Sequence, residues 1–178
     1  MDIIFKRPGL NEAEIQAYEK LGIKYKKYQK KELLQLSALP HPTEADLQEL
    51  QIKFGLLPDE YLNFVKKYNG GIPSKKKIVV GRKEVTISSF FPVVGSARLL
   101  GGIEGQMETY KNRIPLHSIP IAAISGGDLL LLDLREKTHG CVYLWLHELE
   151  SEEDADVYYE NMELVANSFD ELLDKLRD

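Results

Sequence analysis

The chain has 178 residues and a mass of 20.3 kDa, so we expect one domain whose core is large enough to fold without disulfides. Its single cysteine, Cys141, excludes an intramolecular disulfide and fits a reducing compartment. Hydrophobic residues make up 43% and charged residues 29%, which excludes long disordered and fibrous classes, and the net charge of −5 argues against nucleic acid as the main partner.

The charge is distributed unevenly along the chain. Residues 1–83 carry a net charge of +6, residues 84–146 of −1 and residues 147–178 of −10. Because unlike charges attract at long range, the acidic end favours cationic partners and disfavours phosphate backbones. The sequence begins MDIIFKRP, and the apolar run in it is too short for a signal peptide. Nowhere do 18 apolar residues occur together, as a transmembrane helix would require. We therefore expect a cytoplasmic protein that does not contact a membrane.

Residues 1–38 are predicted to form a helical extension of the main domain, which we place at residues 39–178. Asn11 and Glu14 have the spacing of a capping box, in which each side chain accepts a hydrogen bond from the other's backbone amide. The stretch KYKKYQKKELLQL permits a second helix with a weak apolar stripe. The extension either covers one edge of the main fold or forms a basic ligand-binding arm. The first alternative is favoured because lysine-rich helix faces are commonly only solvated.

Two further helices are predicted between residues 43 and 69, each with one apolar stripe. Thr43 and Asp46 repeat the capping pattern at the start of the first helix. Pro58 is expected as the first residue of the second, because proline lacks the amide that would be unpaired there. Residues 69–71, Asn-Gly-Gly, tolerate left-handed backbone and are expected to end that helix. The expected stripes consist of Leu47, Leu50, Phe54, Tyr61, Leu62, Val65 and Tyr68.

From residue 78 the pattern becomes extended, which predicts a hairpin over 78–91 and then a meander of strands over 119–124, 129–134 and 141–147. A short helix is expected near residues 103–110, after a loop over 95–102. A last helix begins at Ser168, capped with Glu171, and should bury Phe169, Leu172, Leu173 and Leu176. The predicted fold class is therefore α+β: an antiparallel β-sheet meander of four or five strands packed against helices.

Catalytic and metal-binding patterns are weak. Cys141 has His139 nearby, but one residue lies in a turn and the other at a strand start, so core packing is the favoured role of the cysteine. The four histidines lack the spacing of zinc ligands, and the acidic stretch lacks the glycine of a calcium loop. No phosphate-binding loop or nucleophile elbow occurs. We expect no enzyme activity, no metal and no cofactor.

Four blocks of the sequence resemble, in order and spacing, the SUKH superfamily of fungal cell-wall assembly regulators and bacterial immunity proteins. The blocks are LLPDEYLNFVKKYNGG (56–71), SGGDLLLLDL (125–134), GCVYLWLHE (140–148) and ANSFDELLDKL (166–176). The resemblance implies an α+β fold and a non-enzymatic role in binding other proteins, which for most bacterial members is the neutralisation of a toxin, often a nuclease. This chain departs from the family in its amino-terminal extension and in its acidic insertion before the last helix. A regulatory scaffold in signalling or cell-wall assembly is the alternative.

The charge distribution suggests where such a partner binds. Nucleases hold polyanions in cationic clefts, so an acidic inhibitor surface is attracted to them at long range. The last strand adds an aromatic platform if its outer face is open; burial of Trp145 and Tyr143 under a helix is the equally weighted alternative. The predicted partner-binding residues are Glu152, Glu153, Asp154, Asp156, Glu160, Tyr143, Trp145 and His147.

Overall fold

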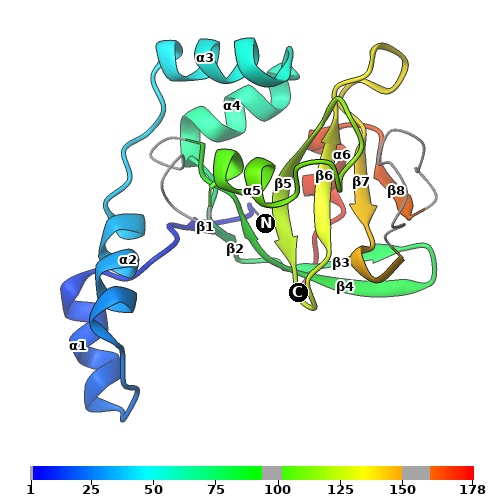
Figure 1. Ribbon diagram of the computed structural model, residues 1–178. Helices are drawn as coiled ribbons and strands as arrows, with labels where there is room; N and C mark the ends of the chain where they lie inside the picture. The colour runs from blue at the N-terminus through cyan, green and yellow to red at the C-terminus, as the bar shows by residue number, and fades with distance from the viewer. Residues whose placement is uncertain (1, 94–101, 150–160) are drawn as a thin grey trace.

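Figure 1 shows a computed structural model in which a twisted antiparallel sheet has one helix in front of it, another behind it, and a helical hairpin projecting from its side. The structure describes residues 2–93, 102–149 and 161–178. The helices are α1 (Glu12–Lys20), α2 (Lys27–Ser37), α3 (Glu44–Phe54), α4 (Asp59–Tyr68), α5 (Ile103–Thr109) and α6 (Phe169–Asp174). The strands are β1 (Phe5–Lys6), β2 (Ile72–Pro73), β3 (Lys77–Val80), β4 (Lys83–Phe90), β5 (Ser118–Ile124), β6 (Leu129–Asp133), β7 (Val142–Trp145) and β8 (Met162–Ala166).

The main sheet has six antiparallel strands, β3 to β8, paired in chain order. The α+β class and the predicted meander are thus confirmed, but the predicted number of four or five strands is wrong. Strand β8 was not predicted because its first three residues are at least partly exposed and show no clean alternation. At the opposite edge, Lys77 of β3 and Arg177 exchange backbone hydrogen bonds of 2.9 Å, so the carboxyl-terminal residues pair with part of this edge strand.

The core is formed on both faces of strand β6, whose five residues are all buried. Helix α5 contacts β5, whereas α6 contacts both β8 and α4. Phe64 of α4 is central to the helical side, with ring centroids 4.9 Å from those of Phe5 and Phe169. The predicted α4 stripe omitted Phe64. Edge-on and tilted aromatic contacts of this kind add about 0.5–1.5 kcal/mol per pair beyond the area that they bury.

The predicted helix boundaries are largely confirmed. The capping boxes of α1 and α3 form, with Asn11 accepting from the amide of Glu14 at 2.9 Å and Thr43 from that of Asp46 at 3.2 Å. Pro58 lies one residue earlier than predicted, as the N-cap of α4 rather than its first residue. Asn69 ends α4 with left-handed backbone, as expected. The predicted loop over 95–102 falls almost entirely outside the described residues.

The amino-terminal helices form a hairpin that projects away from the sheet (Figure 1). Only Ile15 of α1 is buried, and α2 has no buried residue. The favoured alternative was that the extension covers one edge of the main fold. The hairpin instead projects away from the main sheet and does not cover its edge. The division into an extension and a domain at residue 38 stays a prediction. Among the described residues, none of the helices has the length and apolar character needed to cross a bilayer.

Gly70 is expected to tolerate substitution poorly. Its φ is +82°, and a Cβ there would lie 2.7 Å from the carbonyl oxygen of Phe90 and the carbonyl carbon of Phe91. We expect Gly70→Ala to lower the free energy of unfolding by about 2–4 kcal/mol in urea denaturation, since backbone atoms must move as well. Gly126→Ala is the matched control, because Gly126 has a φ of +106° but no atom within 4 Å of its Cβ position. Equal losses in the two variants would contradict the role of the close contact.

Candidate protein-binding surfaces

The acidic part of the predicted partner surface lies outside the described residues. It consists of Glu152, Glu153, Asp154, Asp156 and Glu160. Their role in binding stays a prediction that rests on the sequence and its charge.

Trp145, the centre of the predicted aromatic platform, is fully buried. The ring of Tyr110, which follows α5, packs edge-on against its indole with centroids 5.5 Å apart, and the Arg113 guanidinium lies 6.0 Å from the indole. The alternative of burial is therefore the one that the structure shows for Trp145, because the segment after α5 covers this end of β7. Within the described part of the chain, its Nε1 has no hydrogen-bond partner.

Tyr143 and His147 remain partly exposed. Tyr143 lies between Leu131 of β6 and Leu164 of β8, and Leu164 is 51% exposed, so an apolar surface is open beside the tyrosine. Asp128, in the turn before β6, holds His147 in place: its Oδ1 accepts from the His147 amide at 3.0 Å and lies 2.7 Å from the ring Nδ1. Tyr143 and His147 therefore stay candidates for partner contact. Unlike Trp145, both side chains are partly exposed.

The described residues contain an anionic surface where the start of α4 meets α6, which we call the α4–α6 acidic surface: Glu60, Asp170 and Asp174. The Glu60 carboxylate accepts a 3.3 Å hydrogen bond from the Asp170 amide, which brings the two acids together. Burial, and then repulsion by Glu60 and Asp174, raise the pKa of the Asp170 carboxyl above its usual value. Three acids are thus held close together and form a negatively charged surface, with Glu60 and Asp170 in the first turns of their helices.

The neighbouring acid Glu171 behaves differently. It forms a 2.6 Å ion pair with Lys175, which together with hydrogen bonds from Asn167 lowers the pKa of its carboxyl to about 2. Glu171 is therefore locally neutralised, whereas Asp170 is not. The i,i+4 spacing of Asp170 and Asp174 is readable in the sequence, but the approach of Glu60 depends on the packing of two helices 110 residues apart.

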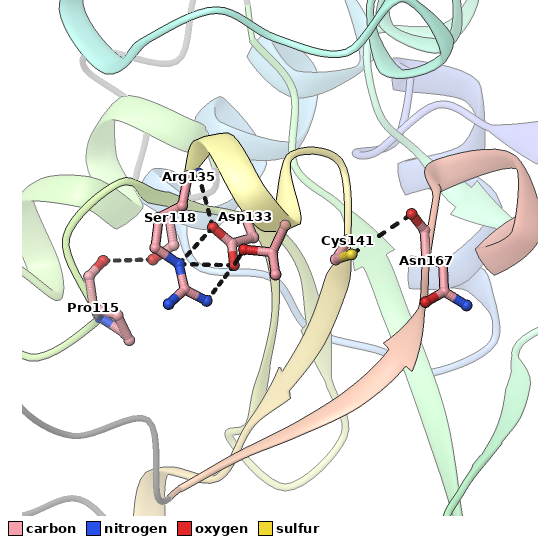
Figure 2. A network of polar contacts seen from close by, with 7 residues as sticks. Pro115, Ser118, Asp133, Arg135, Cys141 and Asn167 are labelled. Atoms are coloured by element: carbon pink, nitrogen blue, oxygen red, sulfur yellow. Dashed lines mark hydrogen bonds and ion pairs between the residues drawn. The ribbon is translucent and has the colours of Figure 1, made fainter.

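A buried polar network lies at the end of strand β6 (Figure 2). The Asp133 side chain accepts hydrogen bonds from the backbone amide and guanidinium of Arg135, and a 2.8 Å bond from the hydroxyl of Thr138. Burial alone would raise the pKa of Asp133, but these hydrogen bonds outweigh it and hold the pKa below its usual value. The carboxylate is occupied by its own turn, so its role is to hold the β6–β7 connection.

Cys141 and His139, both in this connection, do not form a catalytic pair. The thiol lies 3.7 Å from the carbonyl oxygen of Asn167 (Figure 2), and the ring Nε2 of His139 lies 2.8 Å from the carbonyl oxygen of Leu56. Burial, and then the charges of Asp133 and Glu171, raise the pKa of the thiol, which is opposite to the change that activates a nucleophile. Across residues 2–93, 102–149 and 161–178, no three histidine, cysteine or acidic side chains converge as metal ligands.

The structure is an α+β domain with an antiparallel meander of strands. Its described residues include an anionic surface where α4 meets α6. The chain belongs to the SMI1 / KNR4 family (SUKH-1), whose model matches residues 41–175. The SPbeta prophage-derived uncharacterized protein YokK of Bacillus subtilis (strain 168) is 31% identical over 153 residues, which cover 76% of this chain and 75% of YokK. No solved structure matches the chain. The resemblance to the SUKH superfamily is confirmed.

Proposed function

We propose that this protein is an immunity protein that binds a cognate polymorphic toxin domain and neutralises it by direct contact. The observation that carries the proposal is the SUKH-1 match over residues 41–175, because the family is known for immunity proteins. The similarity to a prophage-derived protein agrees with this assignment. The proposal takes the protein to be non-enzymatic, in line with the general character of the family.

The proposed mechanism is occlusion of a cationic active site. A nuclease presents basic residues to hold phosphates, and an anionic surface is attracted to the same residues. Glu60, Asp170 and Asp174 supply such a surface on the described residues. Long-range attraction raises the association rate, which favours an inhibitor that must act before the toxin does.

Tyr143 and the exposed Leu164 beside it are proposed as a separate, apolar partner contact. Aromatic side chains with apolar neighbours commonly contribute most of the binding free energy in protein interfaces. His147, which is partly exposed, is a further proposed contact residue, and the acidic residues Glu152, Glu153, Asp154, Asp156 and Glu160 are proposed from the sequence alone.

The test first asks whether a multidomain toxin is encoded beside the gene for this chain, and then coexpresses the terminal domain of that toxin with this protein. We expect cells that express both proteins to survive, cells that express the toxin domain alone to die, and the two proteins to copurify. Equal killing with and without this protein, together with no complex, would contradict the proposal. The absence of a neighbouring toxin gene would favour the regulatory scaffold instead.

A further inference from the structure

The α1–α2 hairpin lies outside the residues that match the family and carries a surface of its own. Its helices have 9 and 11 residues, and only one of their side chains is buried. Helices this short are marginal in water without tertiary contacts. The hairpin also projects from the body (Figure 1), which leaves its faces accessible to another molecule.

Every charged residue from position 20 to position 31 is a lysine: Lys20, Lys24, Lys26, Lys27, Lys30 and Lys31. Lys30 forms a 2.5 Å ion pair with Glu19 of α1, which ties the two helices together. Within the described ranges of the chain, no ion pair neutralises Lys24, Lys27 or Lys31. The hairpin thus presents uncompensated positive charge, opposite in sign to the α4–α6 acidic surface.

Two of the lysines lie at the N-terminus of α2, where positive charge destabilises a helix. Lys26 is the N-cap of α2, Lys27 is its first residue, and its first turn contains no acid. The N-terminus of a helix carries an effective charge of about +0.5, so cations there are unfavourable. An anionic occupant beside this turn would offset that repulsion.

A shallow groove runs along the same face of α2. It is lined by Lys27, Tyr28, Lys30, Lys31, Leu34 and Gln35. Tyr28 is 62% exposed, and the aliphatic stems of the lysines add further apolar surface around it. The groove therefore combines an apolar floor with a rim of ammonium groups.

We propose that this groove binds an acidic polypeptide segment that carries an apolar side chain between its carboxylates. The apolar side chain packs on Tyr28 and Leu34, and the carboxylates pair with Lys27 and Lys31. This contact uses residues of α2, whereas the proposed toxin contact uses residues of α4 and α6. It is specific to the extension and not to the family domain.

Two other anionic partners fit the groove less well. Residues 10–38 contain no arginine, the side chain whose planar guanidinium matches phosphate best, so a nucleic acid gains little here beyond charge. A membrane surface needs a helix face that inserts apolar side chains, whereas Tyr28 is surrounded by lysines.

The test measures binding of a labelled helical peptide, rich in Glu and with Leu at every fourth position, to the full-length protein by fluorescence anisotropy. We expect a dissociation constant of about 10–100 μM, since one short segment orders few groups on binding. K27E/K31E should weaken binding at least tenfold, and Y28A should weaken it about threefold. K76E/K83E makes the same change of charge at two exposed residues of the β3–β4 region and should leave the affinity within twofold.

Circular dichroism separates binding from folding, because Lys27→Glu places an acid at the start of α2 and should hold or raise its helicity. Loss of peptide binding with unchanged helicity supports the proposal. An unchanged affinity in K27E/K31E, an equal loss in K76E/K83E, or equal binding of a scrambled peptide of the same composition would overturn it. Tighter binding to phosphatidylglycerol vesicles or to duplex DNA than to the peptide would also overturn it. None of these measurements uses the toxin, so the result is independent of the proposed function.

Discussion

Replacement of Asp133 by alanine is expected to lower the free energy of unfolding by about 2–4 kcal/mol. Asp133 is 2% exposed and accepts hydrogen bonds from both Arg135 and Thr138. Removal of the carboxylate leaves the Thr138 hydroxyl and the Arg135 guanidinium without their partner. The estimate stays below that for a fully buried ion pair because the Arg135 side chain is 33% exposed and water solvates it in part. Urea denaturation of the wild-type and variant proteins measures the difference.

Asp133 is also expected to make the protein less stable in acid. Its pKa lies lower in the folded state than the value of about 3.9 in an unfolded chain, so the unfolded state binds more protons near that pH. The stabilisation is fully present above about pH 5 and is lost as the pH falls through about 4 towards the folded-state pKa. Asp133→Asn, which keeps one acceptor oxygen, should cost less than Asp133→Ala and should reduce the slope of stability against pH in this window.

Asp178→Asn provides the baseline for this comparison, because it removes an exposed carboxyl at the end of the chain. The slope of stability against pH should change more in Asp133→Asn than in this control. Identical acid slopes in wild type and Asp133→Asn would contradict the role assigned to the network.

The local pattern of the chain predicts those elements whose causes are local. The capping boxes of α1 and α3 need only residues three apart, and the left-handed exit at Asn69 needs only the residues that follow a helix. The run LLLLD predicts a strand buried on both faces because no alternation is present. Strand β8 escapes prediction because the strand it pairs with, β7, determines its conformation more than its own residues do.

The candidate surfaces depend more on tertiary packing. Alternation along β7 places Tyr143 and Trp145 on one face, but only the position of Tyr110 after α5 decides that Trp145 is buried. The α4–α6 acidic surface likewise requires Glu60 to meet Asp170 from a distant helix. The uncompensated lysines of α2 are visible in the sequence, but their lack of ion pairs within the described part of the chain is a property of the folded hairpin. The sequence therefore predicts the charge of each surface better than its shape.

Neutralisation of the α4–α6 acidic surface is expected to slow association with the toxin domain about tenfold at low salt. The variant is E60Q/D170N/D174N, which removes three negative charges without changing side-chain size. Relief of the repulsion around Asp170 opposes the loss of two acids from the first turns of α4 and α6, so we expect only a small change in stability. Stopped-flow mixing measures the association rate, and thermal denaturation measures the stability.

The matched control, E12Q/E108Q/E136Q, removes the same charge from exposed acids elsewhere on the described surface and should slow association far less. The variant E152Q/E153Q/D154N tests the predicted acidic residues beyond the described ranges in the same assay. At about 0.5 M salt the Debye length falls to roughly 4 Å, so the rates of all variants should converge. Equal rates for wild type and E60Q/D170N/D174N at low salt would exclude electrostatic attraction through this surface. A loss that persisted in high salt would instead assign these residues to the contact itself, because screening removes long-range attraction but leaves short-range packing and hydrogen bonds in place.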